Sequence, residues 1–164
     1  AQVLQYHKLI PIVIDNSPQA LERAKNCGIY YSFAADDDLA ENINEATSGQ
    51  LCDASVYTTC SRIDPALTMR VLANGKRAVL AGFAPIDFNI PARELCEKNA
   101  TLTSVMSGFG YADTALNLLV HKAVNTSLFE KEILTEYDPN AVYGSMGDAA
   151  SVKKGKMTIF KMII

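Results

Sequence analysis

The stretch that decides the fold class runs from residue 12 to residue 26 and reads IVIDNSPQALERAKN. A short apolar run ends in one carboxylate, Asp15, and the next residues supply a helix N-cap, Ser17, and a first helical residue, Pro18. This order predicts a buried strand that is followed at once by a helix. An acidic residue at the carboxyl end of such a strand can accept hydrogen bonds from the two hydroxyls of a ribose, and it favours NAD over NADP because a 2′-phosphate would meet like charge.

Strand-like and helix-like segments alternate along the rest of the chain, and no G-x-G-x-x-G motif precedes Asp15. Continuous apolar strands separated by helices predict a doubly wound parallel α/β sheet, with ligands outside the carboxyl ends of the strands. We see no repeat, low-complexity tract or linker, which predicts one domain. We expect strands or extended pieces at residues 10–15, 29–34, 53–59, 77–83, 88–91, 102–107, 131–137 and 157–164. We expect helices at residues 1–8, 18–26, 38–47, 64–73, 92–98, 111–122 and 140–152.

The composition is that of an ordinary globular chain: 164 residues, 49% hydrophobic, 20% charged and a net charge of −3. The negative charge argues against non-specific binding of nucleic acid. No apolar run reaches the ~18–20 residues of a membrane span, and the first residues do not read as a signal peptide, so we expect a cytoplasmic protein. Four cysteines without a C-x-x-C pair favour reduced thiols over a disulfide framework or a zinc site, namely Cys27, Cys52, Cys60 and Cys96.

The order of several segments resembles the medium-chain dehydrogenases of the zinc-dependent alcohol and polyol dehydrogenase family. The resemblance covers SPQALERAKNCGI, CDASVYTTC, ALTMRVLANGKRAVLAGF, FNIPARELCEKNATLTSVMSGFG, ALNLLVHKAV and KKGKMTIFKMII in that order. It implies that residues 1–164 form the Rossmann-like NAD-binding domain and the C-terminal tail. The family's catalytic domain, its zinc ligands, the first strand of the nucleotide domain and the glycine-rich turn would lie upstream of Ala1. We therefore expect no catalytic residue and no metal ligand in this chain, and no activity of the chain alone.

The resemblance also implies cofactor-binding positions at the carboxyl ends of the strands. The family usually has Gly where Cys60 stands, and it often has a basic residue in the helix start where residues 18–20 stand here. The implied set is Asp15 at the ribose, Asn16 and Ser17 beside the adenosine, Thr58, Thr59 and Cys60 against the adenosine and the nicotinamide ribose, Ala81, Gly82 and Phe83 at the nicotinamide amide, Ser104, Val105 and Met106 beside the nicotinamide ring, and Lys156 at the pyrophosphate.

The resemblance and the sequence pattern lead to two structural expectations. The family's first strand lies between the strands that end at Asp15 and Thr59, so we expect a gap there, filled by upstream residues or by another chain, or marginal stability. Residues Phe88 to Pro91 alternate apolar and polar side chains and are bracketed by prolines, which favours an edge strand. We expect this segment to pair with a second copy in a homodimer, as the family resemblance also implies.

Other functions fit some of the same residues. A methyltransferase that uses S-adenosylmethionine also binds a ribose through an acid at its second strand, although its closing strand is usually one arm of an antiparallel hairpin. A non-catalytic nucleotide-binding or oligomerisation domain is a further alternative. His7 and His121 have no second ligand at helical spacing, which favours surface or capping roles over a metal site. The leading hypothesis is the NAD platform of a dehydrogenase that transfers a hydride between nicotinamide and an alcohol or carbonyl substrate.

Overall fold

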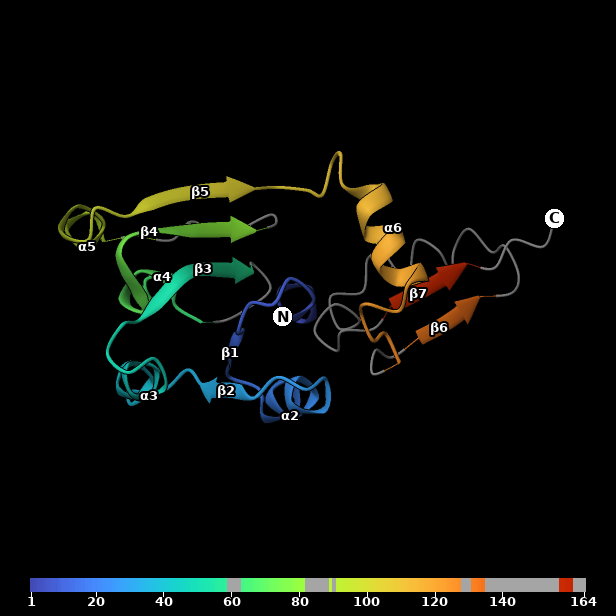
Figure 1. Ribbon diagram of the computed structural model, residues 1–164, viewed down its shortest axis with the longest axis horizontal. Helices are drawn as coiled ribbons and strands as arrows, with labels where there is room; N and C mark the ends of the chain where they lie inside the picture. Colours follow the sequence, from blue (N-terminus) through green and yellow to red (C-terminus); the bar gives the residue numbers. More distant parts are fainter. Residues whose placement is uncertain (59–62, 82–88, 90, 128–130, 135–156, 161–164) are drawn as a thin grey trace. The chain divides into compact units, whose positions relative to one another are not determined.

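The computed structural model describes residues 1–58, 63–81, 89, 91–127, 131–134 and 157–160. The chain divides into two compact units, Ala1–Val124 and Asn125–Ile164. In the first unit every strand pair is parallel, and helices flank the strands (Figure 1). The expected parallel, Rossmann-like α/β architecture is therefore confirmed. Its elements are α1 (Gln2–Tyr6), β1 (Ile12–Asp15), α2 (Pro18–Asn26), β2 (Tyr31–Ala34), α3 (Leu39–Ala46), β3 (Cys52–Thr58), α4 (Leu67–Arg70), β4 (Leu72–Ala81), α5 (Ala92–Glu97), β5 (Thr101–Val105) and α6 (Ala112–Val120).

The strands of the first unit form two separate sheets. One contains β1 and β2, and the other contains β3, β4 and β5 in that order. Within the described ranges no ladder joins β1 to β3, which is the gap that the family resemblance implies. The two strands that would flank a missing first strand therefore do not pair with each other.

The start of α2 forms as the sequence predicts. Ser17 has extended backbone and its hydroxyl accepts a hydrogen bond from the Ala20 N–H at 3.3 Å, while Pro18 occupies the first helical position. The helix is followed by Gly28 at φ +79°, a left-handed conformation that glycine adopts without strain. The bounds of α2 are those expected, because the cap, the proline and the glycine all lie in the local sequence.

The expected helix over residues 64–73 is wrong in its second half. Helix α4 ends at Arg70 and β4 already begins at Leu72, where it pairs with Cys52. Leu72 is 0% exposed, so burial and strand pairing outweigh the turn signal of Asn74 and Gly75, which lie inside the strand. The ladder between β3 and β4 shifts in register between Cys52 and Ala54, and Gly75 has φ +72° there.

Two hydrophobic clusters hold the first unit together. In the first, Leu39, Ile43 and Val71 are buried, and the side chains packed on them come from both sheets and their connections. In the second, Met69 of α4 and Leu72 and Ala78 of β4 are buried. Helix α6, by contrast, contains no buried residue. The partly buried side chains of the first cluster are Ile12, Ile14, Phe33, Ala35, Leu51, Cys52 and Leu67, and those of the second are Leu95, Ala100 and Leu102.

The second unit contains β6 (Lys131–Leu134) and β7 (Met157–Phe160), which pair in parallel. Both strands lie inside the segments expected to be extended. The parallel pairing does not match the antiparallel arm that is usual in the methyltransferase alternative. The helix expected at residues 140–152 lies outside the described residues. Among the described helices, none has the length and apolar character required to cross a membrane.

Candidate cofactor site

A tight turn at the carboxyl end of β1 fixes the acidic residue of the candidate site. The Ser17 N–H donates a 2.8 Å hydrogen bond to Oδ1 of Asp15, so that the carboxylate closes the turn that leads into α2. Asp15 is half-buried, and within the described part of the chain its second oxygen, Oδ2, has no protein partner. An orientated carboxylate with one free oxygen is suited to accept hydrogen bonds from a diol such as a ribose.

The neighbours of Asp15 have more local roles. The Ser17 hydroxyl accepts from Ala20 N–H and donates to Oε1 of Gln19 at 2.9 Å, so it is engaged by its own helix. Asn16 is exposed beside the turn. On the adjacent strand Ala34, a small and exposed residue, pairs with Asp15 in register.

The second sheet brings three of the expected positions into one row. Thr58 pairs with Ala81, and Ala81 pairs with Val105, so the three residues lie side by side across the carboxyl edge of the sheet. Ser104 lies one residue earlier in β5, opposite Leu80. Residue Met106 was expected inside this strand, but β5 ends at Val105, and Met106 follows it with 76% of its surface exposed.

The row of Thr58, Ala81 and Val105 presents small or neutral side chains rather than acids or bases. Such an edge suits a flat ligand that lies across the strand ends and offers no group for proton transfer. The remaining expected positions, Thr59, Cys60, Gly82, Phe83 and Lys156, lie outside the described residues. Most of the segment from Phe88 to Pro91 lies outside them too, so the dimer contact stays a prediction.

Sequence reasoning missed Tyr57 at this edge. Its hydroxyl donates a 2.9 Å hydrogen bond to the main-chain oxygen of Ile63 and so links β3 to the residue that precedes Asp64. Burial raises the pKa of Tyr57, and the charge of Asp64 adds to this, so the hydroxyl keeps its proton and remains a donor. The available signal was a tyrosine at an alternating position of a strand, next to the expected site residue Thr58.

The described residues do not fit a zinc ion. No three His, Cys, Asp or Glu side chains gather there in an arrangement that could hold a metal. His7 and His121 occupy the C-caps of α1 and α6, which are the capping positions favoured for them. Cys27, Cys52 and Cys96 are free thiols.

The fold and the site together define a class of protein. Parallel strands with flanking helices, an acid at the end of one strand and small residues at the ends of the others are typical of a Rossmann-like α/β fold. Residues 1–126, which are more than half of the chain, match the zinc-binding dehydrogenase family. The chain belongs to that family.

The chain is also similar in sequence or in fold to individual known proteins. An uncharacterized zinc-type alcohol dehydrogenase-like protein of Haemophilus influenzae is 26% identical over 120 residues, which are 72% of this chain and 35% of the relative. The alcohol dehydrogenase of Aeropyrum pernix superimposes with a TM-score of 0.70 at 14% identity over 98% of this chain and 45% of its own. An Escherichia coli alcohol dehydrogenase complexed with NADH gives a TM-score of 0.70 at 16% identity over 98% and 48% of the two chains. The chain thus spans about a third of the curated relative and just under half of each solved chain.

Proposed function

We propose that this chain is the NAD-binding part of a dehydrogenase that acts on an alcohol or polyol. The observation that carries the proposal is the turn at Asp15, where one carboxylate oxygen is held by Ser17 N–H and the other is left for a ligand. Family membership supports an oxidoreductase, and the Escherichia coli relative is complexed with NADH. In this proposal Asp15 accepts hydrogen bonds from the adenosine ribose and disfavours the 2′-phosphate of NADP.

The other strand ends would form the platform for the rest of the cofactor. Thr58, Ala81 and Val105 lie in one row, so a cofactor that starts at Asp15 would extend across them toward the ring end. NAD supplies the hydride chemistry when it is bound, and the residues of this chain orient it. In this proposal the zinc and the proton transfer belong to the catalytic domain that the family resemblance implies.

A nuclear magnetic resonance titration tests the proposal. The Ser17 amide is the reporter, since its N–H donates to Asp15 and its shift changes when the carboxylate gains a new partner. We expect NAD to shift this amide at lower concentrations than NADP or S-adenosylmethionine. A stronger response to S-adenosylmethionine would favour the methyltransferase alternative. No response to any of the three would contradict the cofactor assignment and favour a non-catalytic oligomerisation domain.

A further inference from the structure

The end of the first unit at which β1 and β2 begin carries a group of exposed apolar side chains. A single exposed apolar residue is ordinary, whereas several large ones at one place, next to polar residues, are typical of a surface that contacts a partner. We call this group the amino-end patch. Its members are Tyr6, Leu9, Ile10 and Tyr30, which are 54%, 56%, 79% and 85% exposed.

One hydrogen bond and one strand ladder bring the two segments of the patch together. Gln5 of α1 donates through its side-chain nitrogen to the Gly28 oxygen at 2.7 Å, so the end of α1 lies against the residues that lead into β2. Ile12, the first residue of β1, pairs in parallel with Tyr31, the first residue of β2. The residues that precede each of these two strands therefore lie at the same end of the sheet.

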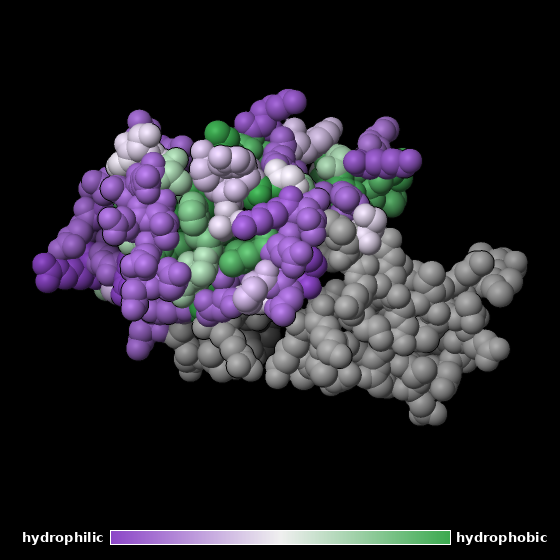
Figure 2. Space-filling model, turned by 90° about the horizontal axis from the view of Figure 1, so that it is seen from below, coloured by the Kyte–Doolittle hydropathy of each residue, from purple (hydrophilic) through white to green (hydrophobic). Residues whose placement is uncertain are grey.

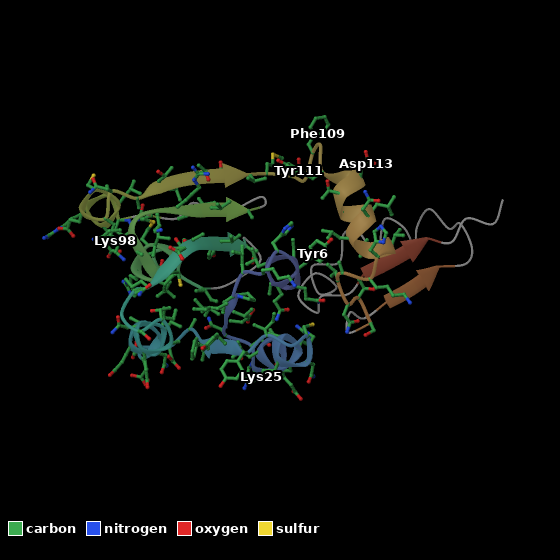
Figure 3. All side chains as sticks on the ribbon, viewed as in Figure 1. Tyr6, Lys25, Lys98, Phe109, Tyr111 and Asp113 are labelled. Atoms are coloured by element: carbon green, nitrogen blue, oxygen red, sulfur yellow. The ribbon has the colours of Figure 1, made fainter. Side chains whose placement is uncertain are left out.

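Basic side chains lie beside the amino-end patch. We call them the basic rim, and its members, all exposed, are His7, Lys8, Arg23 and Lys25. Arg23 and Lys25 belong to the last turn of α2, and Figure 3 shows Lys25 on α2 and Tyr6 on α1. Among residues 1–30 the acids are Asp15 and Glu22, and Asp15 lies at the opposite end of β1. Because the whole chain has a net charge of −3, the positive charge of this region is local.

The aromatic rings of the patch are held by neighbouring rings. The Tyr6 ring packs edge-on against His7 with the centroids 5.3 Å apart, and the Tyr30 ring packs edge-on against Tyr31 at 4.9 Å. A ring that is already held loses little conformational freedom when a partner covers it. Apolar side chains also lie between hydrophilic ones on the face that carries α2 and α3 (Figure 2).

The size and composition of this region favour one class of partner. A stable protein–protein contact takes roughly 20–30 residues from each side, and the patch with its rim is much smaller. A lipid surface requires less, namely a few apolar side chains that enter the headgroup region and basic side chains that attract anionic lipids. Tyrosine is also enriched at the boundary between lipid and water, because its ring is apolar and its hydroxyl is polar.

From these observations we infer that the amino-end patch and its basic rim bind the surface of a membrane that contains anionic lipids. Ile10 and Tyr30, the most exposed members of the patch, enter the headgroup region, and the cations of the rim lie against the lipid phosphates. Asp15, the candidate ribose-binding residue, lies at the other end of β1. The contact is therefore independent of the proposed cofactor site, and the protein can bind both at once.

Sedimentation of the protein with vesicles tests the role of charge. The probes are vesicles of phosphatidylcholine alone and vesicles in which phosphatidylglycerol supplies about a third of the lipid. We expect roughly tenfold tighter binding to the anionic vesicles at low ionic strength, and release at ~0.5 M salt. Lys25→Glu should weaken binding by about fivefold or more. Lys122→Glu, an exposed cation after α6, is the matched control and should bind as the wild type does. Equal binding to the two kinds of vesicle, or equal losses in the two variants, would overturn the inference.

Tryptophan reporters test the apolar contact. The protein contains no Trp, so Tyr30→Trp introduces a single fluorophore into the patch. We expect its emission to shift to shorter wavelength when anionic vesicles are added. Phe109→Trp is the matched control, because Phe109 is 93% exposed but lies near Asp113 rather than near a basic rim (Figure 3). Ile10→Ser should lower the affinity of the Tyr30→Trp protein for the vesicles roughly tenfold.

Three outcomes of the fluorescence test would contradict the inference. The first is the absence of a shift in Tyr30→Trp, and the second is an equal shift in Phe109→Trp. The third is a shift of Tyr30→Trp with a soluble acidic amphipathic peptide and none with vesicles, which would assign the amino-end patch to a protein partner. Circular dichroism of each variant confirms that a loss of binding does not reflect a loss of fold.

Discussion

The side-chain ammonium of Lys98 donates a 2.7 Å hydrogen bond to the main-chain oxygen of Met69. The same ammonium donates to the oxygens of Arg70 at 2.9 Å and Leu72 at 2.7 Å, so it satisfies three carbonyls where α4 ends and β4 begins. The Lys98 oxygen in turn accepts from Gly75 N–H at 2.7 Å. Figure 3 shows Lys98 beside α5, at the edge of the sheet opposite the strand ends that form the candidate site. One lysine therefore fixes the early start of β4 that the sequence did not predict.

Replacement of Lys98 should destabilise the fold. In Lys98→Met the three carbonyls lose a charged donor, and we expect the free energy of unfolding in urea to fall by about 1–2 kcal/mol. The matched control is Lys76→Met, because Lys76 forms an ion pair with Asp53, whose side chain is 90% exposed. We expect that control to change the free energy by less than about 0.5 kcal/mol. Equal effects of the two variants would show that the Lys98 contacts do not stabilise this junction.

The first hydrophobic cluster should be the most sensitive part of the core. Ile43 is 0% exposed and its cluster includes side chains from both sheets, so Ile43→Ala should lower the free energy of unfolding by about 3 kcal/mol. Leu116 in α6 is 58% exposed, and Leu116→Ala should cost less than about 1 kcal/mol. Both are measured by urea denaturation. A cost at Leu116 as large as that at Ile43 would mean that α6 is buried in the protein in solution.

Cys52 should give the stability a pH dependence. Burial raises the pKa of the Cys52 thiol above its usual 9.0, and the charge of Asp53 adds to this, so the folded state holds the proton more tightly than the unfolded state. The contribution of the protonated Cys52 thiol to the stability of the folded state is fully present below the thiol's pKa in the unfolded chain. It is lost as the pH rises through the thiol's pKa in the folded chain. We expect the unfolding free energy to fall above pH ~9, and this fall to be smaller in Cys52→Ala but unchanged in Cys96→Ala, whose thiol is exposed. An unchanged slope in Cys52→Ala would refute the assignment.

The homodimer remains a prediction from the sequence. Phe88 alternates with polar residues between two prolines, so Phe88→Asp should convert a dimer to a monomer in sedimentation equilibrium at tens of micromolar. Asn89→Asp is the matched control, since it adds the same charge at an exposed neighbour. A monomeric wild-type chain, or a Phe88→Asp variant that remains dimeric, would remove this segment as the interface.

The fold was predictable where local signals and tertiary packing agree. At β1 and α2 an apolar run, a cap, a proline and a glycine all lie within one short segment, and the helix bounds of Pro18–Asn26 match. At α4 and β4 the local signal and the tertiary packing disagree. Asn74 and Gly75 are a local signal for a turn, whereas the pairing of Leu72 with Cys52 joins residues that are distant in the sequence. No sequence pattern reveals that Lys98 lies close to the carbonyls of α4.

The candidate site was predictable to a similar extent. The position of Asp15 at a strand end follows from the apolar run before it, whereas its hydrogen bond from the Ser17 N–H is known only from the structure. The common row of Thr58, Ala81 and Val105 requires the strand register, which only the structure provides. Nothing in the alternating pattern of β3 indicates that the Tyr57 hydroxyl donates to the main-chain oxygen of Ile63.

The most direct test of the cofactor assignment is a calorimetric titration of wild-type chain and Asp15→Asn with NAD and NADP. The variant keeps the shape of the side chain and removes its charge, and Asp37→Asn, at an exposed acid after β2, is the matched control. We predict that Asp15→Asn weakens NAD by roughly 1.5–3 kcal/mol, affects NADP less, and narrows the preference between them, while Asp37→Asn leaves both affinities unchanged. An equal loss for both cofactors, or none for either, would contradict the role of Asp15 as the ribose-binding acid.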